Sequence, residues 1–259
     1  MTKFAAAFVF LTAVPAFAQD EHIGLRVREW YARTSGTLSS QENGVPPTNL
    51  DLHDDLGLGE QQFTHEIQVY GRIPFFGRLY AGWWHSHDSG SGVLDKTVTF
   101  AGETFTASTQ IDSEYTLDVA YLTYELALPT IPIGDLVQFE IAPNLSVRGI
   151  WASGSIEGSG LSGSDSGKVG LPTVGVHATV RLFDFIRTEA EVTGLQFRYG
   201  DHEAHYLEVY GEAVVEPLPF LFVGVGYKLV QINYTNSGND PSHVNLDIAG
   251  FYITFGARF

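Results

Sequence analysis

The chain has 259 residues, a formal net charge of −16, 13% aromatic residues and no cysteine. The acidic balance excludes a sequence-independent nucleic-acid binder, because neutralising phosphates requires clustered Lys and Arg. The absence of cysteine excludes disulfide scaffolds, thiol catalysis and lipoprotein attachment. An apolar fraction of 44% argues against disorder. These limits leave a compact, acidic chain rich in aromatic residues.

The first eighteen residues predict a secretory signal peptide. Lys3 gives a basic start, residues 4–14 form a short apolar stretch, and Ala16 and Ala18 form an A-x-A cleavage site. The apolar stretch is shorter than the roughly 20 residues that a membrane-spanning helix needs. We therefore expect cleavage after Ala18, export of residues 19–259 as one domain, and no membrane-spanning helix in the mature chain.

Apolar and polar residues alternate along most of the mature chain, which predicts β-strands with one apolar and one polar face. In residues 137–151, for example, Val137, Phe139 and Ile141 alternate with Gln138 and Glu140. Ten strands are expected, with eight as the alternative if the weaker hairpins lie outside a barrel. They fall near 23–33, 62–73, 78–87, 114–128, 137–151, 172–182, 186–197, 207–216, 221–229 and 246–259.

The connectors between these strands alternate in length. Short turns are expected at 74–77, 129–134, 183–185 and 217–219, and long polar loops at 34–61, 88–113, 152–168, 198–205 and 235–245. Short turns at one end and long loops at the other are typical of outer-membrane β-barrels. Aromatic residues near the strand ends, such as Trp83 and Trp151, fit the girdles of such barrels. Within the second loop, residues 96–108 predict an extramembrane hairpin.

One apolar face runs to the last residue of the chain through Phe251, Ile253, Phe255 and Phe259. This ending resembles the C-terminal signal of bacterial outer-membrane barrels, and the mature chain resembles a small barrel of the OmpA/OmpW-like group. The resemblance implies an antiparallel up-and-down barrel in the cell outer membrane. It also implies contact with outer-membrane lipid and lipopolysaccharide, and folding by the barrel-assembly machinery. We further expect a monomer with no cofactor.

In a membrane barrel the polar faces point into the lumen. Reading each strand by its alternation, the inward bases are Arg26, Arg28, Arg72, Arg78, Arg148, Arg181, Arg187, Lys228 and Arg258. The inward acids are Glu66, Asp118, Glu140, Glu189, Glu191, Glu208, Glu212 and Glu216. Nine bases against eight acids predict paired layers that fill a narrow lumen, because buried charges need partners.

The first long loop is acidic. It contains Glu42, Asp51, Asp54, Asp55 and Glu60, with no Lys or Arg from 34 to 60. Two interpretations stay open: solvation of an external loop, or carboxylates that bridge through cations to lipopolysaccharide phosphates. The run from Asp55 to Leu58 resembles a feature of uncharacterised barrels in this group.

Candidate catalytic or metal-binding groups are few. His85 and His87 share a strand face and could form a rim metal site with Asp88, or an ordinary polar rim. The cluster at 201–205 lacks the HExxH spacing of a helical zinc site. Ser86 points away from both histidines, so it cannot pair with either.

Two families of barrel enzymes have short catalytic motifs that can be compared with this sequence. Omptin-type proteases pair an Asp-x-Asp with an Asp-x-His; residues 20–22 and 51–53 have the second spacing, but the chain has no Asp-x-Asp. Deacylases of the PagL kind carry a His-x-Ser on the lipid-facing surface, which His87 and Ser89 match. We therefore expect a non-enzymatic barrel with a filled lumen and an envelope-structural or surface-interaction role. The alternatives are a lipid A-modifying or omptin-like barrel enzyme, and a narrow pore for small solutes.

Overall fold

The computed structural model describes residues 23–40, 48–59, 61–73, 77–126, 128–134, 136–183, 185–238 and 241–259. The predicted signal peptide lies outside these residues. Ten long strands dominate: β1 (Ile23–Ser40), β3 (Gln62–Ile73), β4 (Gly77–Val93), β7 (Gln110–Leu126), β9 (Val137–Gly158), β10 (Leu161–Leu182), β11 (Ile186–Tyr199), β12 (His202–Leu218), β13 (Leu221–Asn236) and β14 (Ser242–Arg258). Four short strands accompany them: β2 (Thr48–Asp51), β5 (Val98–Phe100), β6 (Glu103–Phe105) and β8 (Ile131–Ile133). No helix among the described residues is long and apolar enough to cross a membrane.

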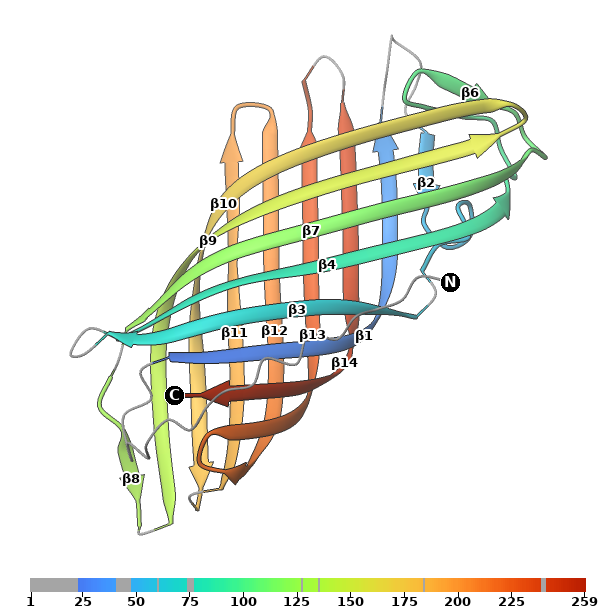
Figure 1. Cartoon of the computed structure of the whole chain (residues 1–259). Helices are drawn as coiled ribbons and strands as arrows, with labels where there is room; N and C mark the ends of the chain where they lie inside the picture. Colours follow the sequence, from blue (N-terminus) through green and yellow to red (C-terminus); the bar gives the residue numbers. More distant parts are fainter. Residues whose placement is uncertain are drawn as a thin grey trace.

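The ten long strands form a closed antiparallel barrel (Figure 1). Each pairs with the next long strand in the chain, and β14 pairs with β1 to close the ring. Closure extends to the last residue: Phe259 N–H donates to the Ile23 carbonyl (2.8 Å), and Ile23 N–H donates to the Phe259 carbonyl (3.2 Å). A closed ring leaves no unpaired barrel edge. The prediction of ten strands is confirmed, and the alternative of eight is wrong.

The outer face of the barrel is apolar over its turn-end half. Val176, Val225 and Phe251 point outward, and their exposed fractions are 49%, 61% and 72%. Their chain neighbours on the inner face, such as His177 and Tyr252, are buried. An apolar face this large would be an aggregation hazard in water, so the barrel has the polarity of a membrane protein.

The strands continue well beyond the apolar band at the loop end. β9 and β10 stay paired up to Gly158 and Leu161, and β11 meets β12 at Gly200 and Asp201. The loops predicted at 152–168 and 198–205 are therefore wrong. Apart from Ile156 and Leu161, these extensions consist mostly of polar and small residues, so the apolar period ends although the backbone pairing continues. The β9–β10 hairpin closes through Ser159 (φ 53°) and Gly160 (φ 77°), the two positive φ values of a tight hairpin turn.

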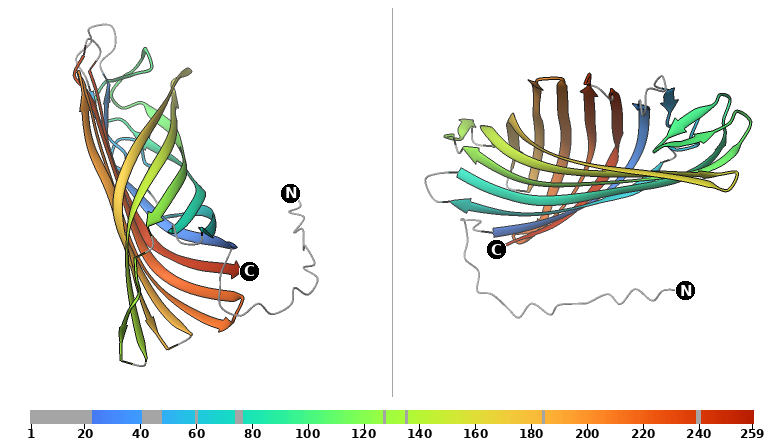
Figure 2. Two further views of the ribbon diagram at one scale, coloured as in Figure 1. Left: turned by 90° about the vertical axis from the view of Figure 1, so that its left-hand side faces the viewer. Right: turned by 90° about the horizontal axis from the view of Figure 1, so that it is seen from above.

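Four of the extended strands, β4, β7, β9 and β10, form an overhang. They lie side by side and slope away from β11–β14 (Figures 1 and 2). The pairing of β10 with β11 ends at Val174 opposite Gly194, whereas β10 stays paired with β9 along its whole length. The barrel wall therefore divides between β10 and β11 at the loop end.

A cap built from residues 48–59 and the β5–β6 hairpin packs against the overhang. The hairpin predicted at 96–108 is confirmed. The buried cluster beneath the cap consists of Leu50, Leu52, Leu56, Leu58, Leu94, Val98, Phe105, Ile111 and Ile156. The cap backbone approaches β4 closely at Gly90, where a Cβ atom would lie 2.1 Å from the Gly57 carbonyl oxygen. Only glycine fits at Gly90.

Carboxylates of the acidic first loop stabilise this cap. Asp55 is 5% exposed, and its Oδ2 accepts hydrogen bonds from the Asp51 backbone N–H (2.7 Å) and from Lys96 Nζ (2.9 Å). The bond to Asp55 raises the pKa of Lys96. Asp88 Oδ2 accepts from the Gly59 N–H (2.7 Å), and Ser113 Oγ donates to the Leu56 carbonyl. The run from Asp55 to Leu58 therefore anchors the cap to β4 and β7.

Candidate functional site

A continuous chain of ion pairs crosses the lumen, with bases and acids in strict alternation. Its distances range from 2.7 to 3.9 Å, and its members come from β1, β3, β9, β11, β12, β13 and β14. We call it the lumen charge chain. Its links are Arg148–Glu208, Glu208–Lys228, Lys228–Glu66, Glu66–Arg28, Arg28–Glu212, Glu212–Arg26, Arg26–Glu189, Glu189–Arg187, Arg187–Glu216 and Glu216–Arg258.

The centre of this chain is almost fully buried. Lys228 is 1% exposed, and its Nζ lies 3.1 Å from both Glu66 Oε2 and Glu208 Oε1. Arg28 is 2% exposed and joins Glu66 (3.2 Å) to Glu212 (3.1 Å). Each charge thus has opposite charges on two sides, the condition under which buried ions are tolerated.

Aromatic side chains complete the central layer. Lys228 Nζ lies 5.3 Å from the Trp30 ring and 5.7 Å from the Trp84 ring, within cation–π range. Tyrosine hydroxyls occupy remaining carboxylate lone pairs: Tyr121 donates to Glu66 (2.6 Å) and Tyr206 to Glu208 (2.5 Å). These contacts fix the acids as well as neutralise them.

Glycines on the inner face make room for these rings. A Cβ atom on Gly82 would lie 2.3 Å from Cζ of Tyr121, and one on Gly226 would lie 2.3 Å from Cζ of Tyr252. Each tyrosine therefore lies across a glycine of a neighbouring strand. The inward glycines thus determine where the aromatic rings can pack.

An apolar layer covers the charge chain on the loop side. Trp30 and Trp84 pack edge to face with centroids 6.0 Å apart. They share a buried cluster with Leu117, Val119, Ile150, Tyr206, Val230 and Ile248. From the turn end towards the loop end, the lumen is therefore filled by charge pairs and then by an apolar layer.

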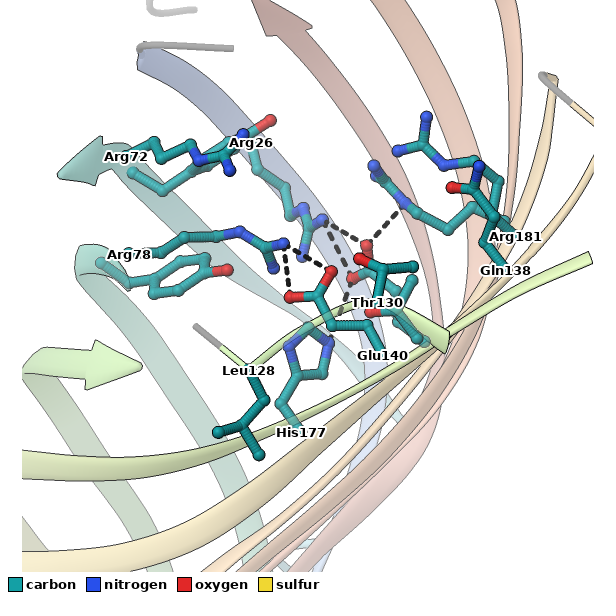
Figure 3. Close-up of a pocket in the computed structure, with 14 residues that line it drawn as sticks. Arg26, Arg72, Arg78, Leu128, Thr130, Gln138, Glu140, His177 and Arg181 are labelled. Atoms are coloured by element: carbon teal, nitrogen blue, oxygen red, sulfur yellow. Dashed lines mark hydrogen bonds and ion pairs between the residues drawn. The ribbon is translucent and has the colours of Figure 1, made fainter. Parts of the chain in front are cut away.

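On the turn side of the chain lies a pocket of about 290 Å³, shown in Figure 3. Five arginines (Arg26, Arg72, Arg78, Arg181 and Arg187) and His177 line it, together with only two acids, Glu140 and Glu189. A side branch of the charge chain forms part of its wall. The links of this branch are Glu189–His177 (3.9 Å), His177–Glu125 (2.7 Å), Glu125–Arg78 (2.9 Å) and Arg78–Glu140 (2.7 Å).

The structure places most of the predicted lumen charges on the inner face, with two differences. Asp118 lies on the outer face, where it accepts hydrogen bonds from Trp83 Nε1 (3.1 Å) and pairs with His85 Nδ1 (3.0 Å). The sequence interpretation failed because its neighbours Leu117 and Val119 belong to the apolar layer inside the lumen. Glu125 lies inside and was missed, although it continues the inward period of Tyr121 and Thr123.

The predicted lumen charges outside the charge chain lie at different depths in the barrel. Arg72 lies at the exposed turn-end mouth and Arg181 is half-buried there. Glu191 lies further in, where it accepts a hydrogen bond from Asn144 (3.2 Å). When Glu125 takes the place of Asp118 in the predicted set, that set still has nine bases and eight acids.

On the outer face, one row of directly opposed residues marks the change from apolar to polar surface. The row crosses β1, β3, β4, β7, β9 and β10 as Glu29, His65, His85, Asp118, Trp151 and Lys168. Glu29 pairs with His65 (2.6 Å), as His85 does with Asp118. Aromatic and polar residues at one level are typical of a membrane interface.

The metal hypothesis for His85, His87 and Asp88 is wrong in its geometry. Asp88 points inward to the cap and is 6% exposed, whereas both histidines point outward. Among the described residues, no group of three or more His, Asp or Glu side chains could hold a metal ion. In the cluster at 201–205, His202 contacts Tyr234 (2.8 Å), and hydrogen bonds from Gln196 and Arg198 lower the pKa of Glu203.

The structure treats the two enzyme-like motifs, Asp-x-His and His-x-Ser, differently. Residues 20–22 lie outside the described residues, and Asp51 Oδ1 accepts the backbone N–H groups of His53 (2.8 Å) and Asp54 (2.9 Å) in a local turn. His87 and Ser89 share the outer face of β4. His87 Nδ1 lies 3.7 Å from Glu114 Oε1, and Ser89 is directly opposite Glu114 on β7.

Comparison with known proteins supports the fold alone. No protein-family model and no curated protein sequence matches the chain. Among solved structures, the outer membrane protease OmpT from Escherichia coli matches with 10% identity and a TM-score of 0.53, covering 92% of this chain and 96% of that one. The translocator domain of the autotransporter NalP from Neisseria meningitidis matches with 13% identity and a TM-score of 0.40, covering 91% and 88%. The chain therefore has the fold of a bacterial outer-membrane β-barrel; the OmpA/OmpW grouping is not confirmed.

Removing the central cation tests the energetic role of the charge chain. Lys228→Met should lower the free energy of unfolding by about 3–5 kcal/mol, because it leaves Glu66 and Glu208 buried with one partner fewer. Urea unfolding of the protein refolded in lipid vesicles measures this change. Arg198→Met is the control, because it removes the exposed pair with Glu203 and should leave stability nearly unchanged. Equal stabilities for the two variants would contradict this role.

Proposed function

We propose that the protein is a non-enzymatic outer-membrane barrel, closed to conduction, with an envelope-structural or surface-interaction role. The observation that carries this proposal is the lumen charge chain. At its level the remaining cavity, lined by Arg28, Glu66 and Arg148 among others, is about 20 Å³. A cavity of that volume holds about one water molecule, which supports a lumen closed to conduction at this layer.

The proposed location rests on three features. The barrel has an apolar outer band, a polar row at the loop side of that band, and a sequence that begins with the predicted signal peptide. We propose that it enters the outer membrane as a monomer through the barrel-assembly machinery, with Phe251, Ile253, Phe255 and Phe259 as the assembly signal. Lipid and lipopolysaccharide would then contact the band and the polar row.

The surface role rests on the overhang. Its β7, β9 and β10 segments surround a depression of about 360 Å³ lined by hydroxyl groups and the acids Glu114 and Asp165. This polar surface extends beyond the membrane band, where it can meet neighbouring envelope molecules. Asp51 and Asp55 of the acidic first loop form hydrogen bonds within the cap, which favours a structural role for these two carboxylates.

Conductance separates the closed barrel from the narrow-pore alternative. The purified, refolded protein should show no steady conductance in planar lipid bilayers, because the charge chain and the apolar layer both block the lumen. Insertion is verified separately by heat-modifiable migration of the reconstituted protein. Reproducible single-channel openings whose ion selectivity changes in Arg148→Ala would overturn the closed barrel.

A lipid-modifying enzyme is a second candidate, favoured by one contact. His87 lies beside Glu114 on the outer face, with Ser89 on the same face, so a serine, a base and an orienting acid occupy adjacent positions. If this candidate holds, the purified protein shortens the acyl content of outer-membrane lipids, and Ser89→Ala abolishes the change. Ser91→Ala, two residues further along the same face, is the control. The closed structural barrel instead predicts no mass change in lipid A or phospholipid for any of these proteins.

A further inference from the structure

We propose that the arginine-lined pocket at the turn end of the barrel binds a phosphate-bearing anion. The pocket lies beyond the turn-side face of the lumen charge chain, so it ends blindly against that layer. Binding there needs no passage through the barrel. The inference is therefore independent of whether the lumen conducts.

The first argument is the charge of the pocket. Five arginines and two glutamates line it, a balance of +3 with His177 neutral. The two glutamates are already engaged: Glu140 accepts both bonds from Arg78 Nη2 (2.7 and 2.9 Å), and Glu189 pairs with Arg26 and Arg187. Arg78 and Arg187 also pair with Glu125 and Glu216, which lie outside the lining, so the positive charge that the ion pairs of the described residues leave uncompensated includes that of Arg181.

The second argument is the register of the arginines. Arg72 is directly opposite Arg78 on β3 and β4, and Arg181 is directly opposite Arg187 on β10 and β11. Like charges in directly opposed positions destabilise a sheet. In each pair one arginine, Arg78 or Arg187, is held by acids, and the arginine opposite it adds a second positive charge to the pocket.

The third argument is that some hydrogen-bond donors of the pocket arginines have no acceptor in the described part of the chain. No carboxylate of the described residues lies within ion-pair distance of Arg181, which lies beside Gln138 in Figure 3. The Nε atom of Arg26, in a side chain that is 4% exposed, has no hydrogen-bond partner. Thr130, Gln138 and Thr179 add hydroxyl and amide groups to the lining.

These features favour phosphate over other anions. Guanidinium groups present paired N–H donors that match phosphate oxygens in bidentate geometry. An anionic group in the pocket would give Arg181 a partner of opposite charge and would reduce the repulsion within each opposed arginine pair. Two sources carry this chemistry: a soluble phosphate compound on the turn side of the membrane, and the headgroup of an anionic phospholipid.

Binding of inorganic pyrophosphate to the full-length refolded protein tests the site. Isothermal titration in a neutral detergent should detect binding to the unmodified protein, and Arg181→Gln should raise Kd about tenfold or more through loss of a charged hydrogen bond. Arg198→Gln removes the same charge at the loop end and should change Kd less than about twofold. Heat-modifiable migration confirms that each variant is folded. Arg72→Gln provides a second variant if Arg181→Gln fails to fold.

Repeating the titration in lipid nanodiscs distinguishes a soluble phosphate compound from a phospholipid headgroup as the natural ligand. A weaker apparent affinity in phosphatidylglycerol than in phosphatidylcholine shows that a lipid headgroup competes for the site. Equal affinities in the two lipids show that the site takes a soluble phosphate compound. Absence of pyrophosphate binding in detergent, or equal Kd values for the unmodified protein, Arg181→Gln and Arg198→Gln, would overturn the proposal.

Discussion

The structure depends on one constraint: charges enclosed in a narrow barrel must be neutralised by charges from other strands. Arg28 of β1 satisfies it through Glu66 of β3 and Glu212 of β12, and Lys228 of β13 through Glu66 and Glu208. An isolated charge would cost several kcal/mol there, whereas an alternating chain offsets that cost at every link. The charge chain therefore ties strands together that share no backbone hydrogen bonds.

The same constraint explains the composition of the inner face. Tyrosine hydroxyls occupy carboxylate lone pairs, and glycines such as Gly82 leave room for the tyrosine rings. Tryptophans cover Lys228 and begin the apolar layer. The chain as a whole is strongly acidic, but its inner face carries nearly equal numbers of bases and acids. The surplus acid lies elsewhere, and part of it forms the hydrogen bonds of the cap.

Much of the barrel could be predicted from the sequence, because alternation specifies which side of the wall a residue occupies. The strand number, the outward valines and most lumen charges follow from it. Asp118 was misplaced because an apolar layer inside the lumen reverses the usual pattern locally. The extensions of β9–β12 were missed because they consist mostly of polar and small residues and carry no continuous apolar face. The ion-pair partners could not be predicted, since alternation says nothing of which strands meet across the lumen.

The turn-end pocket was hidden for a related reason. Its arginines were each predicted to point inward, but the structure shows that Arg72 lies opposite Arg78 and that Arg181 lies opposite Arg187. Which strands bring their arginines to the same pocket across the lumen depends on how the barrel closes.

The most direct test of the proposed closed lumen is the reactivity of single cysteines introduced into this cysteine-free chain. Thr254 lies on the inner face of β14 and is fully buried, whereas Ser166 is exposed on the overhang. A charged methanethiosulfonate reagent should modify Thr254→Cys at least about 100-fold more slowly than Ser166→Cys, because the reagent reaches the lumen only when the barrel opens. Modification of the two cysteines at similar rates in the folded protein would contradict a lumen closed by its charge chain.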